Sequence, residues 1–108
     1  MMDTLARLTE FPPIIRKGLG FALYQAQIGQ QHESAKMLRG FCEAVWQVRA
    51  DDRSGTYRAV YVARFGDAIY VLHAFQKKAT SGIATPRREL DLIRQRLKLA
   101  RKLAGKRG

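Results

Sequence analysis

The sequence predicts an α+β protein in which helices pack on a small antiparallel β-sheet, and three observations predict this fold class. Residues 55–78 have the composition of two strands joined by a tight turn, the segment before them alternates like a third strand, and helical periodicity lies on both sides. We therefore expect a single domain over residues 1–108, with a helical part over 1–29, an antiparallel meander over 44–78 and a basic C-terminal helix over 86–104.

The central hairpin has the strongest pattern. Tyr57–Arg64 and Ile69–Phe75 are rich in Val, Ile, Tyr and Phe, which suit a pleated, half-buried surface. Gly66 suits the first central position of a type II′ turn, because that position needs a positive φ. A two-residue loop of Gly66 and Asp67 then sets the register of the hairpin.

This register sorts the side chains of the hairpin onto two faces, because side chains alternate along a strand. The opposed pairs are Arg64–Ile69, Val62–Val71, Val60–His73 and Arg58–Phe75. One face carries Arg58, Val60, Val62, Val71, His73 and Phe75, with Lys77 beyond them. The other carries Tyr57, Ala59, Tyr61, Ala63, Tyr70, Leu72 and Ala74. His73 is then a diagonal neighbour of Arg58, so an imidazole and several cations gather at one end of the hairpin.

The N-terminal part predicts two helices. Asp3–Glu10 forms a short first helix, and a second runs from Pro13 to about Ile28, since proline is tolerated in a first turn. Gly29 is a suitable stop residue, and the glycines at positions 18 and 20 allow close packing. Gln30–Gly40 is expected to be a polar connector.

The remaining elements follow in order. Ala44–Ala50 alternates as a strand with Trp46 in the core, and Asp51–Gly55 is a turn by composition that leads into the hairpin. Thr85 is expected to cap the last helix, with Pro86 at its first position and an end near residue 103.

The charge balance favours an anionic partner. Twenty basic and 9 acidic residues give a net charge of +11, and nucleic acid or the ribosome is the simplest partner for such an excess. Segment 86–108 alone holds 9 basic and 2 acidic residues. This segment is either an arm that contacts phosphates or a solvated amphipathic helix with a frayed basic tail. A merely soluble basic surface is the alternative for the whole chain.

Composition also excludes several classes of protein. Cys42 is the only cysteine, so there is neither a disulfide framework nor Cys/His spacing for a metal. No apolar run reaches the ~18 residues of a membrane span, and Asp3 and Glu10 interrupt the N-terminus where a signal peptide would be apolar. We therefore expect a cytoplasmic protein with no membrane partner.

A combination of motifs resembles a known family. The motifs are Trp46-Gln47-Val48-Arg49, then Tyr57-Arg58-Ala59-Val60-Tyr61, then Leu72-His73-Ala74-Phe75-Gln76-Lys77-Lys78, and finally Thr85-Pro86 at the start of a helix. In this order they resemble the phage-derived HigB-like toxins of the RelE/ParE superfamily of toxin–antitoxin systems. The resemblance covers the chain from about Phe11 to the last helix.

The resemblance implies a function and partners. It implies the RelE/ParE-like toxin fold and an mRNA interferase that cuts messages on the ribosome, without a metal or other cofactor. In such enzymes a ribose 2′-hydroxyl attacks the adjacent phosphate. A cognate helix-turn-helix antitoxin, HigA-like, is expected to neutralise the toxin, and their complex is expected to reach operator DNA through the antitoxin.

The resemblance also implies roles for residues. Arg58 matches the arginine that stabilises charge on the phosphate, and Lys78, or its neighbour Lys77, matches the basic residue after the last strand. Arg49 falls where relatives place a lysine, whereas Gln47 falls where they place another lysine, so a proposed base of the reaction is missing. From the hairpin register we add His73 as a catalytic acid or base. Further candidate RNA contacts are Arg53, Arg87 and Arg88.

Alternatives remain at this stage. His73 is equally well interpreted as a packed strand histidine that is hydrogen-bonded to the backbone, and Arg58 as the partner of Asp51 or Asp52 in a salt bridge. The same fold also serves as a ParE-like inhibitor that binds gyrase, and a non-catalytic basic nucleic-acid-binding module is a third class. Relatives usually begin with a β-strand, which Met1-Met2-Asp3 does not suggest, so an uncovered sheet edge is expected.

Overall fold

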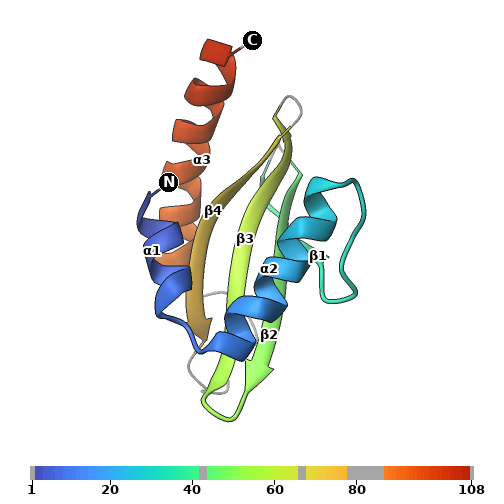
Figure 1. The fold of residues 1–108 in the computed structure, drawn as a ribbon. Coiled ribbons are helices and arrows are strands. Elements are labelled where there is room, and N and C mark those ends of the chain that lie inside the picture. The colour runs from blue at the N-terminus through green and yellow to red at the C-terminus, as the bar shows by residue number, and fades with distance from the viewer. Residues whose placement is uncertain (1, 42–43, 66–67, 78–86, 108) are drawn as a thin grey trace.

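A computed structural model describes residues 2–41, 44–65, 68–77 and 87–107 of the chain (Figure 1). Its elements are α1 (Met2–Glu10), α2 (Pro13–Gln27), β1 (Lys36–Met37), β2 (Val45–Asp52), β3 (Gly55–Phe65), β4 (Ala68–Lys77) and α3 (Arg87–Arg107). The strands form one antiparallel sheet in the order β1-β2-β3-β4. The predicted α+β fold with a meander sheet is confirmed. The predicted turn at Gly66, the cap at Thr85 and Pro86, and Lys78 lie outside the described residues.

Helices cover both faces of the sheet, so the core has two parts (Figure 1). The α1 and α2 side buries Phe11, Ile15, Leu19, Ala22, Val48, Tyr57, Ala59, Tyr61 and Ala74. The α3 side buries Val45, Val60, Val62, Leu72, Phe75, Ile93, Leu97 and Ala100. Each face of the sheet therefore has its own apolar contacts, and the strands carry apolar side chains on both faces.

Helix α2 begins and ends where the sequence predicts. Pro13 occupies its first turn, where a missing N–H has no cost. At the other end Gly29 has a φ of 86°, the left-handed conformation that glycine adopts without strain. The N–H of Gln30 donates to the Gln25 carbonyl at 2.8 Å, and that of Gly29 donates to the Ala26 carbonyl at 3.2 Å. This pair of bonds is a Schellman motif, which ends the helix.

The predicted hairpin register holds at both ends but not in the middle. Val60 pairs with His73 and Arg58 with Phe75, as predicted. A β-bulge follows, so that Val62 pairs with Tyr70 rather than with Val71, and a second irregularity before Phe65 restores the register at the turn.

The bulge changes the face of the sheet on which several β4 side chains lie. An extra residue in one strand reverses the alternation beyond it. The hairpin register predicts Tyr70 and Leu72 on the face of Tyr61, but both pack on the α3 side, whereas Val71 packs on the α2 side. The bulge thereby brings Leu72 and the neighbouring His73 to the same side of the sheet, where His73 contacts α3.

Strand β1 lies inside the predicted polar connector, so that prediction is wrong at Lys36 and Met37. Lys36 pairs with Gln47, and Met37 with Trp46. The Ser34 hydroxyl accepts from the Arg49 N–H at 3.1 Å, which extends this edge. A strand of two residues is too short to show alternation, and its pairing to β2 comes from backbone groups that any sequence has.

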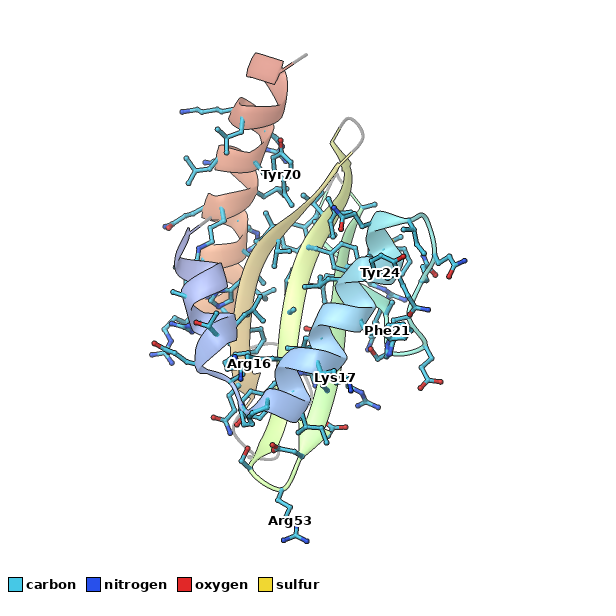
Figure 2. The ribbon with its side chains drawn as sticks, in the orientation of Figure 1. Arg16, Lys17, Phe21, Tyr24, Arg53 and Tyr70 are labelled. Atoms are coloured by element: carbon cyan, nitrogen blue, oxygen red, sulfur yellow. The ribbon has the colours of Figure 1, made fainter. Side chains whose placement is uncertain are left out.

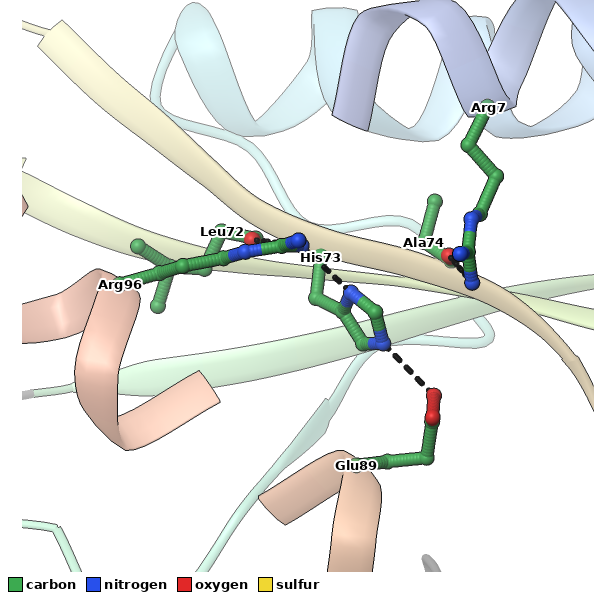
Figure 3. Close-up of polar contacts among 6 residues, drawn as sticks. All are labelled: Arg7, Leu72, His73, Ala74, Glu89 and Arg96. Carbon is green, nitrogen blue, oxygen red and sulfur yellow. Dashed lines mark hydrogen bonds and ion pairs between the residues drawn. The ribbon is translucent and has the colours of Figure 1, made fainter. Parts of the chain in front are cut away.

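Arginine side chains border strand β4, which is an edge of the described sheet (Figure 3). Arg96 of α3 donates from Nη1 to the Leu72 carbonyl at 3.1 Å, and Arg7 of α1 donates from Nη1 to the Ala74 carbonyl at 3.5 Å. An edge strand with free carbonyls invites pairing with another chain, and charged side chains that occupy such groups oppose it. Two of the carbonyls of this edge are thus already engaged within the chain.

The two helical glycines of α2 differ in their surroundings, which gives a testable contrast. A Cβ at position 18 would lie 3.2 Å from the Cβ of Ala50 in β2, whereas a Cβ at position 20 meets nothing within 4 Å. We expect Gly20→Ala to raise the free energy of unfolding by about 0.5–1 kcal/mol, because it restricts the unfolded chain. Gly18→Ala should gain less, since Ala50 must move. Urea unfolding of both variants measures this, and equal gains would show that α2 does not approach β2 closely.

Candidate functional site

The β2–β3 pairing brings two arginines face to face. Arg49 in β2 lies directly opposite Arg58 in β3, on the side of the sheet that also carries Val45, Val60 and Val62. Directly opposed side chains on an antiparallel pair lie about 5 Å apart at Cβ. The pairing follows from the short connection between Asp52 and Gly55, so a turn predicted from composition places the two cations together.

More side chains extend this basic region along the same face. Gln47 is the next residue of β2 on that side, is 4% exposed and pairs with Lys36 of β1, whose side chain is exposed. On the other side of β3, Phe75 lies opposite Arg58 and Lys77 lies opposite Thr56. We define the phosphate-site candidate as Arg58, Arg49, Gln47 and Lys36.

Among the described residues, no carboxylate forms an ion pair with Arg58. Its side chain is half-buried, and its Nε is buried without a hydrogen-bond partner in the described part of the chain. Burial lowers the pKa of Arg58, the neighbouring charge of Arg49 lowers it further, and Asp51 raises it. Even so, the guanidinium stays protonated in a protein. A partly desolvated cation that lies beside another cation favours the binding of an anion.

The alternative role for Arg58, a structural salt bridge, is not supported within the described residues. Asp51 contributes a favourable field but no ion pair with Arg58, and Asp52 instead accepts hydrogen bonds from Ser54 at 2.7 Å and 2.6 Å. Ser54 also bonds the hydroxyl of Tyr57 at 2.6 Å. These contacts tie the β2–β3 turn together and leave Arg58 outside their network.

His73 is held in a buried network between β4 and α3 (Figure 3). The residue is 0% exposed, its Nε2 lies 2.6 Å from Oε2 of Glu89, and its Nδ1 lies 2.6 Å from Nη1 of Arg96. The ring also stacks on Phe75 with centroids 5.4 Å apart. Because a guanidinium only donates, Nδ1 must accept and Nε2 must carry the proton that is donated to Glu89.

This network favours the neutral form of His73. Burial lowers its pKa most, the hydrogen bond and charge of Glu89 raise it, and the charges of Arg96 and Arg7 lower it, so that the pKa lies below its ordinary value. Protonation would also place an N–H against the guanidinium of Arg96. Neither ring nitrogen is available to a substrate in this arrangement. The catalytic role stays a prediction from sequence, and the geometry suits the packed-histidine alternative, with side chains rather than backbone as partners.

The lowered pKa of His73 predicts how stability depends on pH. The unfolded chain takes up this proton near its ordinary pKa of 6.5, and the folded chain resists it until a lower pH. The contribution of His73 is therefore fully present above pH 6.5 and is lost as the pH falls toward the folded pKa. Urea unfolding at several pH values between about 7.5 and 5 should show this fall in stability. His73→Gln, which has no titrating group, should flatten the profile in that window; an unchanged slope would contradict the assignment.

The other predicted site residues lie apart from one another. Arg53 is exposed at the tip of the β2–β3 turn and points away from the sheet (Figure 2). Arg87 and Arg88 are exposed in the first turn of α3, near Glu89. Lys77 ends β4, but its side chain, like Lys78, lies outside the described residues. Arg49 and Arg58 are thus the two predicted site residues that the described structure brings together.

Sequence reasoning missed Lys36, Glu89 and Arg96 as neighbours of these residues. Lys36 was missed because β1 was not predicted. Glu89 and Arg96 are seven residues apart, so they lie on one side of α3. A buried histidine needs polar partners, and a search of this side of α3 for such partners of His73 would have identified both residues.

The fold and the comparisons together define the class of this protein. The α+β arrangement of N-terminal helices, an antiparallel meander and a C-terminal helix is consistent with the RelE-like fold. The model of the family described as "Phage derived protein Gp49-like (DUF891)" matches residues 6–98, and the chain therefore belongs to this Gp49-like family. The family is associated with toxin–antitoxin systems of the HigB/RelE kind. No curated protein and no solved structure gives a significant match.

The structure also bears on membranes and metals. Within the described ranges, no helix combines the length and the apolar character that crossing a bilayer requires. Nor do those ranges bring together three or more His, Cys, Asp or Glu side chains that could hold a metal ion.

Proposed function

We propose that this protein is the HigB-like toxin of a type II toxin–antitoxin system and that it is an endoribonuclease that cleaves mRNA on the ribosome. The observation that carries the proposal is the half-buried Arg58, opposed by Arg49 and without an ion pair among the described residues. Such a pair of guanidinium groups suits the non-bridging oxygens of a phosphate. Membership of the Gp49-like family supports the toxin assignment.

The proposed reaction uses the RNA's own nucleophile. The ribose 2′-oxygen attacks the adjacent phosphorus and loses its proton, the bond to the 5′-oxygen breaks, and that oxygen takes up a proton. The products are a 2′,3′-cyclic phosphate and a 5′-hydroxyl. Arg58 donates hydrogen bonds to the oxygens on which negative charge increases, and its position on a strand keeps it oriented. Arg49 adds a second charge, and Lys77 or Lys78 contacts the phosphate from the end of β4.

His73 has a positioning role in this proposal. Since Glu89 and Arg96 hold both ring nitrogens, His73 connects β4 to the N-terminal half of α3 and keeps Phe75 stacked beside it. Phe75 lies opposite Arg58, so the network supports the strand segment that carries the phosphate-site candidate.

The proposed partners follow from this activity. The substrate is mRNA in a translating ribosome, which places the activity in the cytoplasm. A helix-turn-helix antitoxin, HigA-like, neutralises the toxin, and the pair reaches operator DNA through the antitoxin. The exposed Arg53, Arg87 and Arg88 supply further phosphate contacts. The reaction needs no metal or other cofactor.

Mapping of RNA ends in expressing cells tests the proposal. Primer extension on mRNA should show new cuts in register with codons when the wild-type chain is expressed, and these cuts should disappear when initiation is blocked. Arg16→Ala, which removes an exposed charge from α2 on the opposite side of the sheet, is the matched control and should cut normally.

Two other results would reject the proposal in favour of a different class. Arrested growth with intact messages and inhibited DNA supercoiling would indicate a ParE-like gyrase inhibitor. RNA binding that falls steeply with salt, without cuts or arrest, would indicate a non-catalytic binding module.

A further inference from the structure

Helix α2 has a second apolar face, which points away from the sheet. Its inner face buries Ile15, Leu19 and Ala22 completely. Its outer face carries large side chains that are mostly exposed: Ile14 (68%), Phe21 (55%), Tyr24 (57%) and, at the residue that caps the C-terminal end of the helix, Ile28 (52%), with Lys17 exposed among them. We call these five residues the outer stripe. Figure 2 shows Lys17, Phe21 and Tyr24 along α2, in front of the sheet.

The spacing of the outer stripe is that of a helix–helix seam. Its members alternate in steps of three and four, which places them within roughly 80° of one another around the helix. Single exposed apolar residues are ordinary, but a continuous row on one helix marks an interaction surface. A 3–4 repeat presents knobs to the grooves of a second helix. The row therefore fits an α-helix better than an extended peptide.

Charge selects the kind of helix that fits. Within α2, Arg16 and Lys17 are the charged residues, and no Asp or Glu occurs in it. The whole chain carries +11. A second copy of this chain would bring these cations against one another, and like charges across an interface are unfavourable. A helix with acidic residues beside its apolar positions would pair with Arg16 and Lys17 instead.

The outer stripe is partly ordered before binding. The ring of Phe21 contacts the ring of His32 edge-on, with centroids 6.0 Å apart, and His32 is in turn bonded through Nδ1 to Ser34 at 2.7 Å. An aromatic side chain that is already restrained loses less freedom when a partner arrives.

We propose that the outer stripe is the docking surface for an acidic amphipathic α-helix of a partner protein. The surface lies on the α2 side of the sheet, whereas Arg49 and Arg58 lie on the α3 side, so a docked helix leaves the phosphate-site candidate uncovered. The proposal is independent of the proposed nuclease activity, because it rests on the shape, apolarity and charge of α2 alone.

Two designed helical peptides test the proposal with the full chain. Both carry Leu at the a and d positions of about three heptads. One has Glu at the flanking positions and the other has Lys. Calorimetry at about 0.15 M salt should give a 1:1 complex with the acidic peptide, with a dissociation constant in the micromolar range, and binding at least about tenfold weaker for the basic peptide.

Matched variants separate docking on α2 from general attraction to a basic protein. Phe21→Ser combined with Tyr24→Ser should weaken acidic-peptide binding at least about tenfold. Leu99→Ser combined with Leu103→Ser, which removes similarly exposed residues (53% and 50%) from the basic helix α3, should leave it unchanged. Circular dichroism confirms that both variants fold.

Several results would overturn the proposal. These are no binding of the acidic peptide, equal binding of the two peptides, or equal loss in the α3 variant. Sedimentation that shows a dimer of the free wild-type chain, lost in the Phe21 and Tyr24 variant, would assign the stripe to a second copy and would also overturn it.

Discussion

Replacing Arg58 with alanine is expected to lower the rate of mRNA cleavage about a hundredfold to a thousandfold, as for other donors aimed at developing charge. The reason is that Arg58 presents a guanidinium beside Arg49 that has no ion pair among the described residues, and alanine removes the hydrogen bonds made to the phosphate in the transition state. Stability should change little, because the described residues give Arg58 no ion pair to lose. The measurement is the single-turnover rate of cleavage on ribosomes programmed with a defined message.

A second substitution at position 58 separates the effect of the charge from that of the guanidinium geometry. Arg58→Lys keeps the charge but loses the planar, two-pronged donor, so it should recover only part of the rate. Arg16→Ala is the matched control for loss of one cation and should retain the wild-type rate. A folded Arg58→Ala protein that cleaves at the wild-type rate would remove Arg58 from the catalytic site.

His73→Ala is expected to lower the free energy of unfolding by about 3–5 kcal/mol, because it removes two buried hydrogen bonds to charged groups, each worth about 1.5–3 kcal/mol. The substitution leaves Glu89 and Arg96 without their shared ring and empties the space against Phe75. Urea unfolding measures the loss. His32→Ala is the matched control: His32 is only partly buried and bonds to Ser34 in a loop, so its loss should cost about 1 kcal/mol or less.

A second His73 variant distinguishes structure from catalysis. His73→Gln keeps a donor and an acceptor and removes the titrating ring. If His73 positions the strand, the folded glutamine variant should still cleave mRNA. If His73 transfers protons in the reaction, cleavage should be abolished although the protein is folded, and the positioning role would be wrong.

Local chemistry predicts most of the fold. The Pro13 start and Gly29 stop of α2, and the strand composition on each side of Gly66, act within a few residues, so the sequence shows them directly. The bulge near Leu72 is different. Both faces of the sheet are apolar, so either assignment of Val71 and Leu72 buries the same kind of side chain. Only packing against helices distant in sequence decides between them.

The same distinction applies to the candidate site. The opposition of Arg49 and Arg58 follows from a short turn and was accessible from sequence. The surroundings of His73 were not, because Glu89 and Arg96 lie 16 and 23 residues away in a helix whose orientation depends on tertiary packing. The predicted position of His73 beside Arg58 on the hairpin suggested a catalytic role for His73, whereas its contacts with α3 indicate a structural role.

The engagement of the β4 carbonyls by arginines has a consequence for synthesis of the chain. Arg96 belongs to α3, which the ribosome makes after every strand of the sheet. Until α3 arrives, the nascent hairpin exposes the Leu72 carbonyl and the apolar face that Ile93 and Leu97 later cover. Stalled or truncated chains that lack α3 should therefore form intermolecular β-structure and become substrates for chaperones and proteases.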